Sequence, residues 1–493
     1  MADKNNWQPK LKGYPHFDAP VSMKVAISLA PNPDLVKHHK FLPFLSYKNF
    51  TKKFGSKKPK ERFIRYGARK DAYIYSYYRK LLMDCYNPLL EKFGLNECVI
   101  AYRHLTYEDK GEIHGKCNIN FAQEAFEEIK RRGECIAITL DISGFFESLT
   151  HDLIKQKWCY LLNTPKLPDD HYRVYKNITN YKIVDLDECY KRLGFMSVET
   201  IGSRKFRRYK YSKKEQPKQL CSMQEFRNKI AGYDPAHTSL IKGNPYSDPK
   251  ADMKLWDKCQ EIEYRGIPQG SPISDVIANM YMLDFDIKLK ALSDKIGAYY
   301  RRYSDDILLI IPANTSNYKE IIEYIKSAVA DEGNLKIKDK KTIVTHFFKK
   351  HDEVEFKSFD GIGLAKGNAF EYLGFGFDGK RILLKSQTLT RYYKKMHHGI
   401  HAIVKTASEK AKLAGSNDLM AFIDVPLIYH RYSNPNREWK NRDGRKARNF
   451  ISYVKRSKSL MSDQSIQKQL RKHRKIIGKT INKAINLIKR NHS

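Results

Sequence analysis

Two adjacent acidic residues, Asp305 and Asp306, are the part of the sequence best suited to chemistry. They belong to YSDD at 303–306, between the apolar segment IGAYYRR and the aliphatic run ILLIIP. This pattern predicts two strands joined by a tight turn that presents both carboxylates. Because neighbouring carboxylates repel each other until a cation binds, the turn is a candidate metal site. Aspartate is also common in ordinary polar turns, so the pair alone leaves that alternative open.

A third carboxylate, Asp141, follows the alternating apolar segment IAITL at 136–140. The pattern predicts a buried strand that ends at Asp141, where a carboxylate is costly unless it is paired or binds a metal. A turn or a helix cap is the alternative for Asp141 alone. Together with Asp305 on an adjacent hairpin, it would form an oxygen cage for Mg²⁺, which binds carboxylates and substrate phosphates. Two such ions would promote an in-line phosphoryl displacement.

The segment RGIPQGSPIS at 265–274 predicts an irregular loop that leads into a helix. Glycine lets the backbone approach a base or a phosphate because it has no Cβ atom. An ordinary turn before a helix is the alternative, and the glycines and prolines alone do not decide between the two.

The elements around these segments predict a mixed helix and sheet chain. We expect Asp71 to cap the first long helix. Helices are predicted from Lys70 to about 93 and at 119–132, 274–293 and 317–331, and strands at 98–104, 335–348 and 371–377.

Composition narrows the class of partner. The 493 residues suggest two to four domains, and 91 Lys and Arg against 55 Asp and Glu give a net charge of +36. Such a charge favours binding to a polyanion. Nucleic acid is the first candidate and an anionic membrane is the second. We expect a cytoplasmic protein with reduced thiols and no membrane partner, because the sequence shows no apolar run long enough to span a bilayer, no signal-peptide pattern and no CxxC pair.

Five segments occur in the order LDISGFF, GIPQGSPIS, YSDD, KKT at 340–342 and YLGF at 372–375. This series resembles the palm motifs of reverse transcriptases. VIAYRH and GKCNINFAQEAF, between 99 and 126, resemble fingers motifs of that family, and ERFIRYGARKDAYIYSYY resembles the first fingers segment. The resemblance implies an α+β right-hand polymerase with fingers, a palm that contains an antiparallel sheet, and a helical thumb.

The same resemblance implies a division of the chain into domains. The predicted parts are an N-terminal arm and fingers at 1–135, a first palm segment at 136–164, a fingers or insert segment at 165–263, a second palm segment at 264–380, and a basic helical thumb or RNA-binding domain at 381–493.

Roles for individual residues follow from the resemblance. Asp141 and Asp305, with Asp306 alongside and the Ile142 carbonyl, would hold two Mg²⁺ ions, for which Mn²⁺ is a substitute. Phe146 would be the steric gate that excludes a ribose 2′-hydroxyl and favours dNTPs; a core phenylalanine is the alternative. Further implied contacts are Arg103 and Lys116 with the triphosphate, Gln269 with the nascent base pair, Lys341 with the leaving pyrophosphate, and Tyr372, Leu373 and Gly374 as the primer grip. A solvated surface for Arg103 and Lys116, and a buried hairpin for 372–374, are the alternatives.

The last 113 residues, 381–493, carry 27 Lys and Arg against six Asp and Glu. The pattern predicts helices with a basic surface that contacts nucleic acid. Ion pairs along a helix cannot neutralise so large an excess of positive charge. His397, His398 and His401 have metal-like spacing but no acidic or cysteine partner nearby in the sequence, so we interpret them as helix surface.

The C-terminal stretch from YHRYSNP to QLRKHRKI is similar to prokaryotic defence-associated reverse transcriptases, including the abortive-infection type. No VTG triplet, Cys/His endonuclease module or ribonuclease H acidic set is recognised. The similarity implies an RNA-directed DNA polymerase that copies a structured non-coding RNA in antiphage defence. Untemplated or protein-primed DNA synthesis is one alternative, and an RNA-binding scaffold with an inactive fold is another. The oligomeric state, including a homo-oligomer, is left open.

Overall fold

The computed structural model describes residues 7–51, 60–201, 204–211, 215–247, 264–315, 317–351, 353–360, 363, 367, 369–434 and 448–490. Helices and strands are both abundant in these ranges, which confirms the predicted α+β class. The chain forms two compact units. Unit 1 comprises 1–103, 139–309 and 315–342, and unit 2 comprises 104–138, 310–314 and 343–493.

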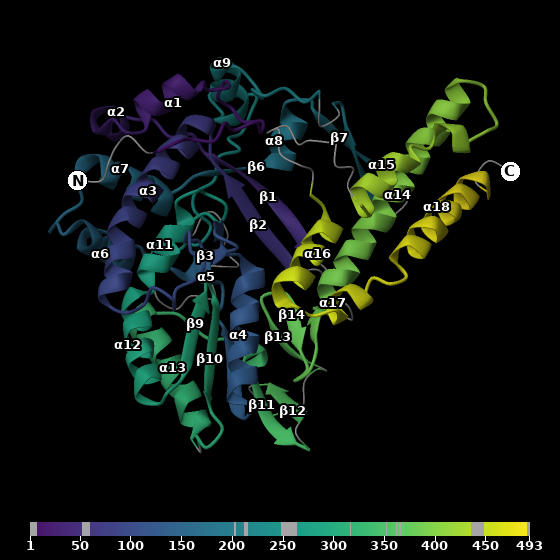
Figure 1. Cartoon of the computed structure of the whole chain (residues 1–493). Helices are drawn as coiled ribbons and strands as arrows, with labels where there is room; N and C mark the ends of the chain where they lie inside the picture. The colour runs from purple at the N-terminus through teal and green to yellow at the C-terminus, as the bar shows by residue number, and fades with distance from the viewer. Residues whose placement is uncertain are drawn as a thin grey trace. The chain divides into compact units, whose positions relative to one another are not determined.

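A five-stranded sheet has the strand order β12-β11-β5-β10-β9. Its strands β9 and β10 lie side by side in Figure 1. The boundary between the two units falls inside β5 and β10. In β10 the five aliphatic residues 307–311 are all buried, as expected for a strand covered on both faces. The strands are β5 (Cys135–Asp141), β9 (Tyr299–Tyr303), β10 (Asp306–Pro312), β11 (Ile343–Lys350) and β12 (Glu353–Asp360).

Unit 1 contains a further, three-stranded sheet and, among the described residues, most of the buried tyrosines. In this sheet β1 pairs antiparallel with β2 and parallel with β6. The long helix α3 buries twelve residues, five of them tyrosines, so it is a core helix. The elements are α1 (Met23–Leu29), α2 (Pro33–Lys37), β1 (Phe44–Thr51), β2 (Lys60–Tyr66), α3 (Arg69–Lys92), α5 (Phe145–Ser148), α6 (His151–Leu162), α7 (Asp169–Thr179), β6 (Ile183–Asp185), α11 (Ser274–Tyr281), α12 (Leu283–Lys295), α13 (Tyr318–Gly333) and η3 (Asp339–Lys341).

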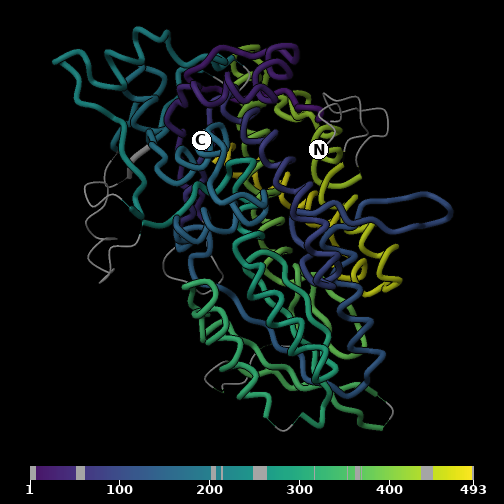
Figure 2. The backbone as a smooth tube through the Cα atoms, turned by 90° about the vertical axis from the view of Figure 1, so that its left-hand side faces the viewer, coloured from purple at the N-terminus to yellow at the C-terminus, as the bar shows by residue number. Residues whose placement is uncertain are grey.

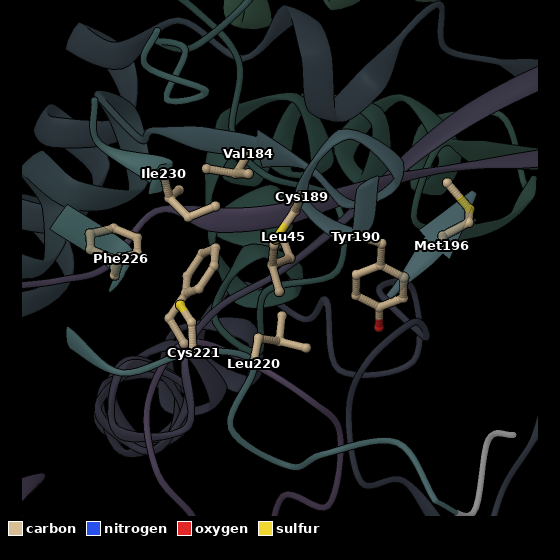
Figure 3. Packing of buried hydrophobic residues seen from close by; sticks show 10 residues of the cluster. Leu45, Val184, Cys189, Tyr190, Met196, Leu220, Cys221, Phe226 and Ile230 are labelled. Carbon is tan, nitrogen blue, oxygen red and sulfur yellow. The ribbon is translucent and has the colours of Figure 1, made fainter. Parts of the chain in front are cut away.

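The tyrosine-rich segment after β6 folds onto the three-stranded sheet of unit 1. Its apolar side chains pack around Leu45 of β1, with Cys189, Leu220 and Phe226 among them (Figure 3). The described part of the predicted insert at 165–263 therefore shares a core with β1, and residues 248–263 lie outside the described ranges. The elements are α8 (Leu186–Arg192), β7 (Met196–Ile201), β8 (Arg204–Tyr209), α9 (Met223–Glu225) and η2 (Phe226–Ile230).

Unit 2 combines a small hairpin, a short sheet and a group of helices. Figure 2 shows the β3–β4 hairpin as an extended blue loop. Helices α14 and α18 lie side by side and bury apolar residues such as Ile400 and Ile481 (Figure 1), so the predicted C-terminal helices are confirmed. The elements are β3 (Thr106–Asp109), β4 (Glu112–Gly115), α4 (Asn118–Arg132), β13 (Phe370–Tyr372), β14 (Phe375–Phe377), β15 (Ile382–Leu384), α14 (Ser386–Leu413), η4 (Met420–Phe422), α15 (Val425–Tyr432), α16 (Phe450–Met461), α17 (Ser465–Lys468) and α18 (His473–Arg490). No helix in the described ranges combines the length and hydrophobicity needed to cross a bilayer.

Three predictions about local structure are wrong. Residues 98–104 form no strand, because only Val99 bridges to Arg302 and the chain then turns. The strand pair expected at 335–348 instead begins at Ile343, after a short 3-10 helix. Asp71 does not cap α3: it is buried inside the first turn and accepts from the Leu42 backbone amide at 3.0 Å.

A buried ion pair fixes the end of β9 in unit 1. The guanidinium of Arg302 donates to both carboxylate oxygens of Asp286 in α12, at 2.7 and 2.6 Å, and both side chains are 0% exposed. Arg302 also donates to the Ser304 carbonyl at 3.1 Å, and Tyr300 donates to Asp286 at 2.6 Å. The pair therefore joins the turn after β9 to helix α12.

We predict that Asp286→Asn destabilises unit 1, because it leaves the buried Arg302 charge without its carboxylate. The expected loss in free energy of unfolding is about 3–5 kcal/mol, measured by urea denaturation. Asp294→Asn is the matched control, because Asp294 pairs with Lys290 on the same helix but is 63% exposed. That surface pair should contribute about 0–1 kcal/mol. Equal losses in the two variants would contradict the anchoring role.

Candidate active site

The structure brings Asp141 and Asp305 together in unit 1. Asp141 is the last residue of β5, and Asp305 lies in the turn between β9 and β10. The Ile142 amide donates to the Asp305 carbonyl at 3.0 Å, so the two segments are joined directly. Burial, and then the charge of Asp141, raises the pKa of Asp305. The charge of Asp141 therefore acts on the Asp305 carboxylate, and the metal-binding role of the pair stays a prediction.

Two lysines neutralise Asp141. Lys338 donates to one carboxylate oxygen at 3.0 Å and Lys341, at the end of η3, donates to the other at 2.5 Å. Burial by itself raises the pKa of Asp141, but the hydrogen bonds and charges of the two lysines outweigh it and the pKa is lowered. Lys341 was predicted near this site from the KKT motif, whereas Lys338 has no sequence signal beyond its proximity to that motif.

The turn itself has an uncommon backbone conformation. Ser304 is buried and has a φ of 61°, in the left-handed region, which costs a non-glycine residue about 1–2 kcal/mol. Two hydrogen bonds hold it: Tyr102 donates to the Ser304 hydroxyl at 3.1 Å, and Arg302 donates to its carbonyl. Asp306 is exposed and begins β10. Asp305 and Asp306 are therefore placed in different environments, because Asp305 is half-buried and Asp306 is exposed.

The oxygen donors at this site fit a hard divalent cation. The set consists of the carboxylates of Asp141 and Asp305 and the Ile142 carbonyl, which accepts from Lys338 at 3.4 Å. Within the described ranges no group of three His, Cys, Asp or Glu side chains is arranged to hold a metal. One or two carboxylates with substrate phosphates are the usual ligands of Mg²⁺. The two ammonium groups on Asp141 show that this carboxylate accepts cationic partners.

Phe146 lies in the short helix α5, directly after the Asp141 segment. Gly144 precedes the helix with a φ of 50°, which allows the sharp change of direction from β5. Phe145 is buried and Phe146 is half-buried, with ring centroids 5.7 Å apart. The Phe146 carbonyl accepts from the Ile267 amide at 2.9 Å, which connects α5 to the glycine-rich loop.

The loop at 265–274 packs against β2 in unit 1. The Arg65 amide donates to the Gln269 carbonyl at 2.9 Å. Gly270 has a φ of +116°, and a Cβ atom there would lie 2.6 Å from the Arg65 carbonyl oxygen. Glycine is therefore required at 270 both by the backbone conformation and by the close approach of β2. The loop is an irregular segment that leads into α11, as predicted.

Arg103 and Lys116 both have partners within their own units. Arg103 donates to Asn87 at 3.0 Å and to the Asn96 carbonyl at 2.6 Å in unit 1. Lys116, in unit 2, forms an ion pair with Glu124 at 2.6 Å. A triphosphate contact by either residue would have to replace these bonds, and the two roles stay predictions.

The 372–374 segment comprises the last residue of β13 and the two-residue turn that leads to β14 in unit 2. Leu373 and Gly374 both have positive φ, 43° and 95°. Asn118, a residue without a sequence signal for this role, donates to the Leu373 carbonyl at 3.1 Å and to the Tyr453 hydroxyl at 3.0 Å. Tyr372 is buried beside this turn. The turn is thus held to α4 and α16, and its primer-grip role stays a prediction.

Arg62 is a site residue that the sequence interpretation missed. It lies on β2, is exposed, and its positive charge lowers the pKa of Asp305. The effect is smaller than those of burial and Asp141, which raise that pKa. The charge of Lys341 lowers the same pKa and precedes that of Arg62 in size, and the basic character of residues 61–70 was the available signal for Arg62.

Comparison with known proteins defines the class of the central segment. Residues 230–377 match the family model of reverse transcriptase (RNA-dependent DNA polymerase). The matched range holds the 265–274 loop, the YSDD turn and the 372–374 turn, while Asp141 precedes it. The segment is thus a reverse transcriptase domain, and this family consists of RNA-directed DNA polymerases, which are nucleotidyltransferases. The predicted enzyme class and right-hand polymerase class agree with this match.

Solved structures of telomerase are similar to this chain. Telomerase from Candida albicans in complex with a TWJ fragment of telomeric RNA shares 11% identity at a TM-score of 0.36, over 75% of this chain and 50% of that one. Apo telomerase from Candida tropicalis shares 10% identity at a TM-score of 0.38, over 89% of this chain and 60% of that one. This chain therefore spans about half to three-fifths of those telomerase chains.

We predict that Gly270→Ala separates the loop from β2, because the new Cβ would collide with the Arg65 carbonyl. The expected result is faster hydrogen exchange of the Arg65 amide, which loses its bond to Gln269. Gly297→Ala is the matched control: its φ is +64°, but no atom lies within 4 Å of the added Cβ. If both variants leave the Arg65 amide equally protected, the close contact is not what requires glycine at 270.

Proposed function

We propose that this protein is a divalent-metal-dependent polymerase that copies RNA into DNA. The observation that carries the proposal is the juxtaposition of Asp141 and Asp305, with the Ile142 amide bonded to the Asp305 carbonyl. The reverse transcriptase domain at 230–377 supports the same reaction class. A site with two repelling carboxylates and a backbone carbonyl is suited to Mg²⁺, with Mn²⁺ as a substitute.

In the proposed mechanism Asp141, Asp305 and the Ile142 carbonyl would hold the metal, with Asp306 alongside. Two bound ions would activate the attacking hydroxyl and stabilise the leaving oxygen of the in-line displacement. Lys341, and with it Lys338, supplies positive charge beside Asp141, where the leaving pyrophosphate carries its negative charge.

Other residues of unit 1 are proposed to select the incoming nucleotide. Phe146 closes the space that a ribose 2′-hydroxyl would need, and its half-buried ring at the start of α5 supports this role. Gln269 and the loop backbone line the nascent base pair, and Arg62 adds positive charge for the triphosphate. Arg103 contributes only if it gives up its bonds to Asn87 and Asn96.

For unit 2 we propose contacts with the primer and the template. The turn at 372–374 is the proposed primer grip, and Lys116 a triphosphate contact. The basic helices after 381 are the proposed thumb, which binds RNA through its phosphates. The domain division at 1–135, 136–164, 165–263, 264–380 and 381–493 is proposed on the same grounds.

We also propose that the template is a structured non-coding RNA and that the enzyme acts in prokaryotic antiphage defence, in the cytoplasm. The support is the similarity of the C-terminal stretch to defence-associated enzymes. Residues 381–493 also carry 27 Lys and Arg against six Asp and Glu. Sequencing of nucleic acid copurified with the protein tests this. A single enriched RNA with complementary DNA is expected, and random cellular RNA without DNA product would contradict it.

We predict that Asp141→Asn and Asp305→Asn each abolish extension of a primer on an RNA template with dNTPs. Loss of a metal ligand should reduce the rate by about a thousandfold or more. Asp34→Asn is the control, because Asp34 is 86% exposed on α2. Full incorporation by Asp305→Asn would show that this carboxylate does not hold the metal.

Phe146→Ala should relax selection against ribonucleotides, because the half-buried ring no longer fills the space next to the sugar. We expect rNTP incorporation relative to dNTP incorporation to rise roughly tenfold to hundredfold, measured as the ratio of kcat/KM values. Phe146→Tyr retains the ring and should keep the selectivity of the natural protein. Unchanged selectivity in Phe146→Ala would assign this ring to the core instead.

A further inference from the structure

The ammonium group of Lys338 lies against two of the proposed metal ligands in unit 1. It donates to one carboxylate oxygen of Asp141 at 3.0 Å and to the Ile142 carbonyl at 3.4 Å. Lys341, by comparison, donates to the other carboxylate oxygen of Asp141. Carboxylate and carbonyl oxygens are also the donors that a hard divalent cation prefers. The Lys338 ammonium therefore uses the same oxygens as the proposed metal.

The backbone fixes Lys338 next to these oxygens. Its amide donates to the Asp141 carbonyl at 3.0 Å, and the preceding residue, Ile337, forms an antiparallel bridge with Ile142. Its own carbonyl accepts from the Thr342 amide at 3.1 Å. Because the backbone is bonded on both sides of the residue, the ammonium group can leave Asp141 by rotation of the side chain alone.

The ion pair between Lys338 and Asp141 is partly shielded from water. The Asp141 side chain is 15% exposed and the Lys338 side chain is 34% exposed. Attraction between opposite charges is stronger here than at a fully exposed surface, and so is repulsion between an ammonium group and a metal ion. Since the Lys338 side chain reaches solvent, it has room to turn away from the carboxylate.

We propose that Lys338 competes with the divalent cation for Asp141 and the Ile142 carbonyl, an inference that rests on the proposed function. Before the metal binds, the Lys338 ammonium neutralises Asp141 beside Asp305. When the metal binds, the ammonium leaves both oxygens and turns towards solvent. Lys338 thereby sets the metal concentration that the site requires.

Two lysines of the same segment provide a matched test. Lys338→Met and Lys336→Met each remove one positive charge and keep an unbranched side chain. The Lys336 carbonyl accepts from the Ser143 amide at 2.7 Å, so its backbone is also fixed, but its side chain is exposed. Among the described residues Lys336 forms no ion pair. Lys338→Arg is the conservative variant, because it retains the charge next to Asp141.

The first measurement is the dissociation constant of Mn²⁺, obtained by titrating the metal alone and following electron paramagnetic resonance. Lys338→Met should bind Mn²⁺ roughly threefold to tenfold more tightly than the natural protein, because the competing charge is gone. Lys336→Met should change the constant by less than about twofold, since its charge is screened by solvent. Lys338→Arg should also stay within about twofold of the natural protein. Asp141→Asn, which should lose the binding, identifies the site.

The second measurement uses the natural protein and depends on neither a variant nor catalysis. Chemical labelling of lysine amines, followed by mass spectrometry, measures how readily each amine reacts. Addition of Mg²⁺ should raise the labelling rate of Lys338 about threefold or more relative to that of Lys336, because the Lys338 ammonium is released from Asp141.

The outcomes separate this inference from the polymerase proposal. Weaker or unchanged Mn²⁺ binding by Lys338→Met, an equal change in Lys336→Met, or a Lys338 labelling rate that does not respond to Mg²⁺ would overturn the competition while the polymerase proposal stands. If Asp141→Asn binds Mn²⁺ as the natural protein does, the proposed metal ligands are wrong, and the competition fails with them.

Discussion

Two carboxylates that repel each other, Asp141 and Asp305, must be kept close together, and the surrounding unit is arranged around this constraint. The buried aliphatic strands β5 and β10 bring the two segments side by side, and the Ile142 amide joins them at the Asp305 carbonyl. The Arg302–Asp286 pair then fixes the turn between β9 and β10, because Arg302 also donates to the Ser304 carbonyl. The free energy that holds the carboxylates together therefore comes from burial of the aliphatic strands, while the ion pair fixes the geometry of the turn.

The same constraint explains the positive charge around the site. Lys338 and Lys341 contact Asp141, and the charges of Lys341 and Arg62 lower the pKa of Asp305. These groups lower the cost of two neighbouring negative charges. A phosphate-bearing substrate would bring further negative charge to this region, which makes the same cations suitable for binding it.

Some of this arrangement follows from local sequence and some does not. The alternation in IAITL predicts the strand that ends at Asp141, and the apolar runs on either side of YSDD predict the two strands that are joined at Asp305, so both positions were predictable. Lys338 and the buried Arg302–Asp286 pair depend on contacts between distant segments, which no local pattern encodes. The strand expected at 98–104 fails for the same reason: its apolar residues are buried by neighbouring elements, and only Val99 finds a bridge partner.

The central claim is that Asp141 and Asp305 hold a divalent cation used to polymerise dNTPs. Electron paramagnetic resonance of Mn²⁺, titrated into the protein with an RNA–DNA primer–template and a non-hydrolysable dNTP analogue, measures this directly. We expect bound Mn²⁺ that is lost in Asp141→Asn and in Asp305→Asn and retained in Asp34→Asn. Equal Mn²⁺ binding by all four proteins would contradict the account.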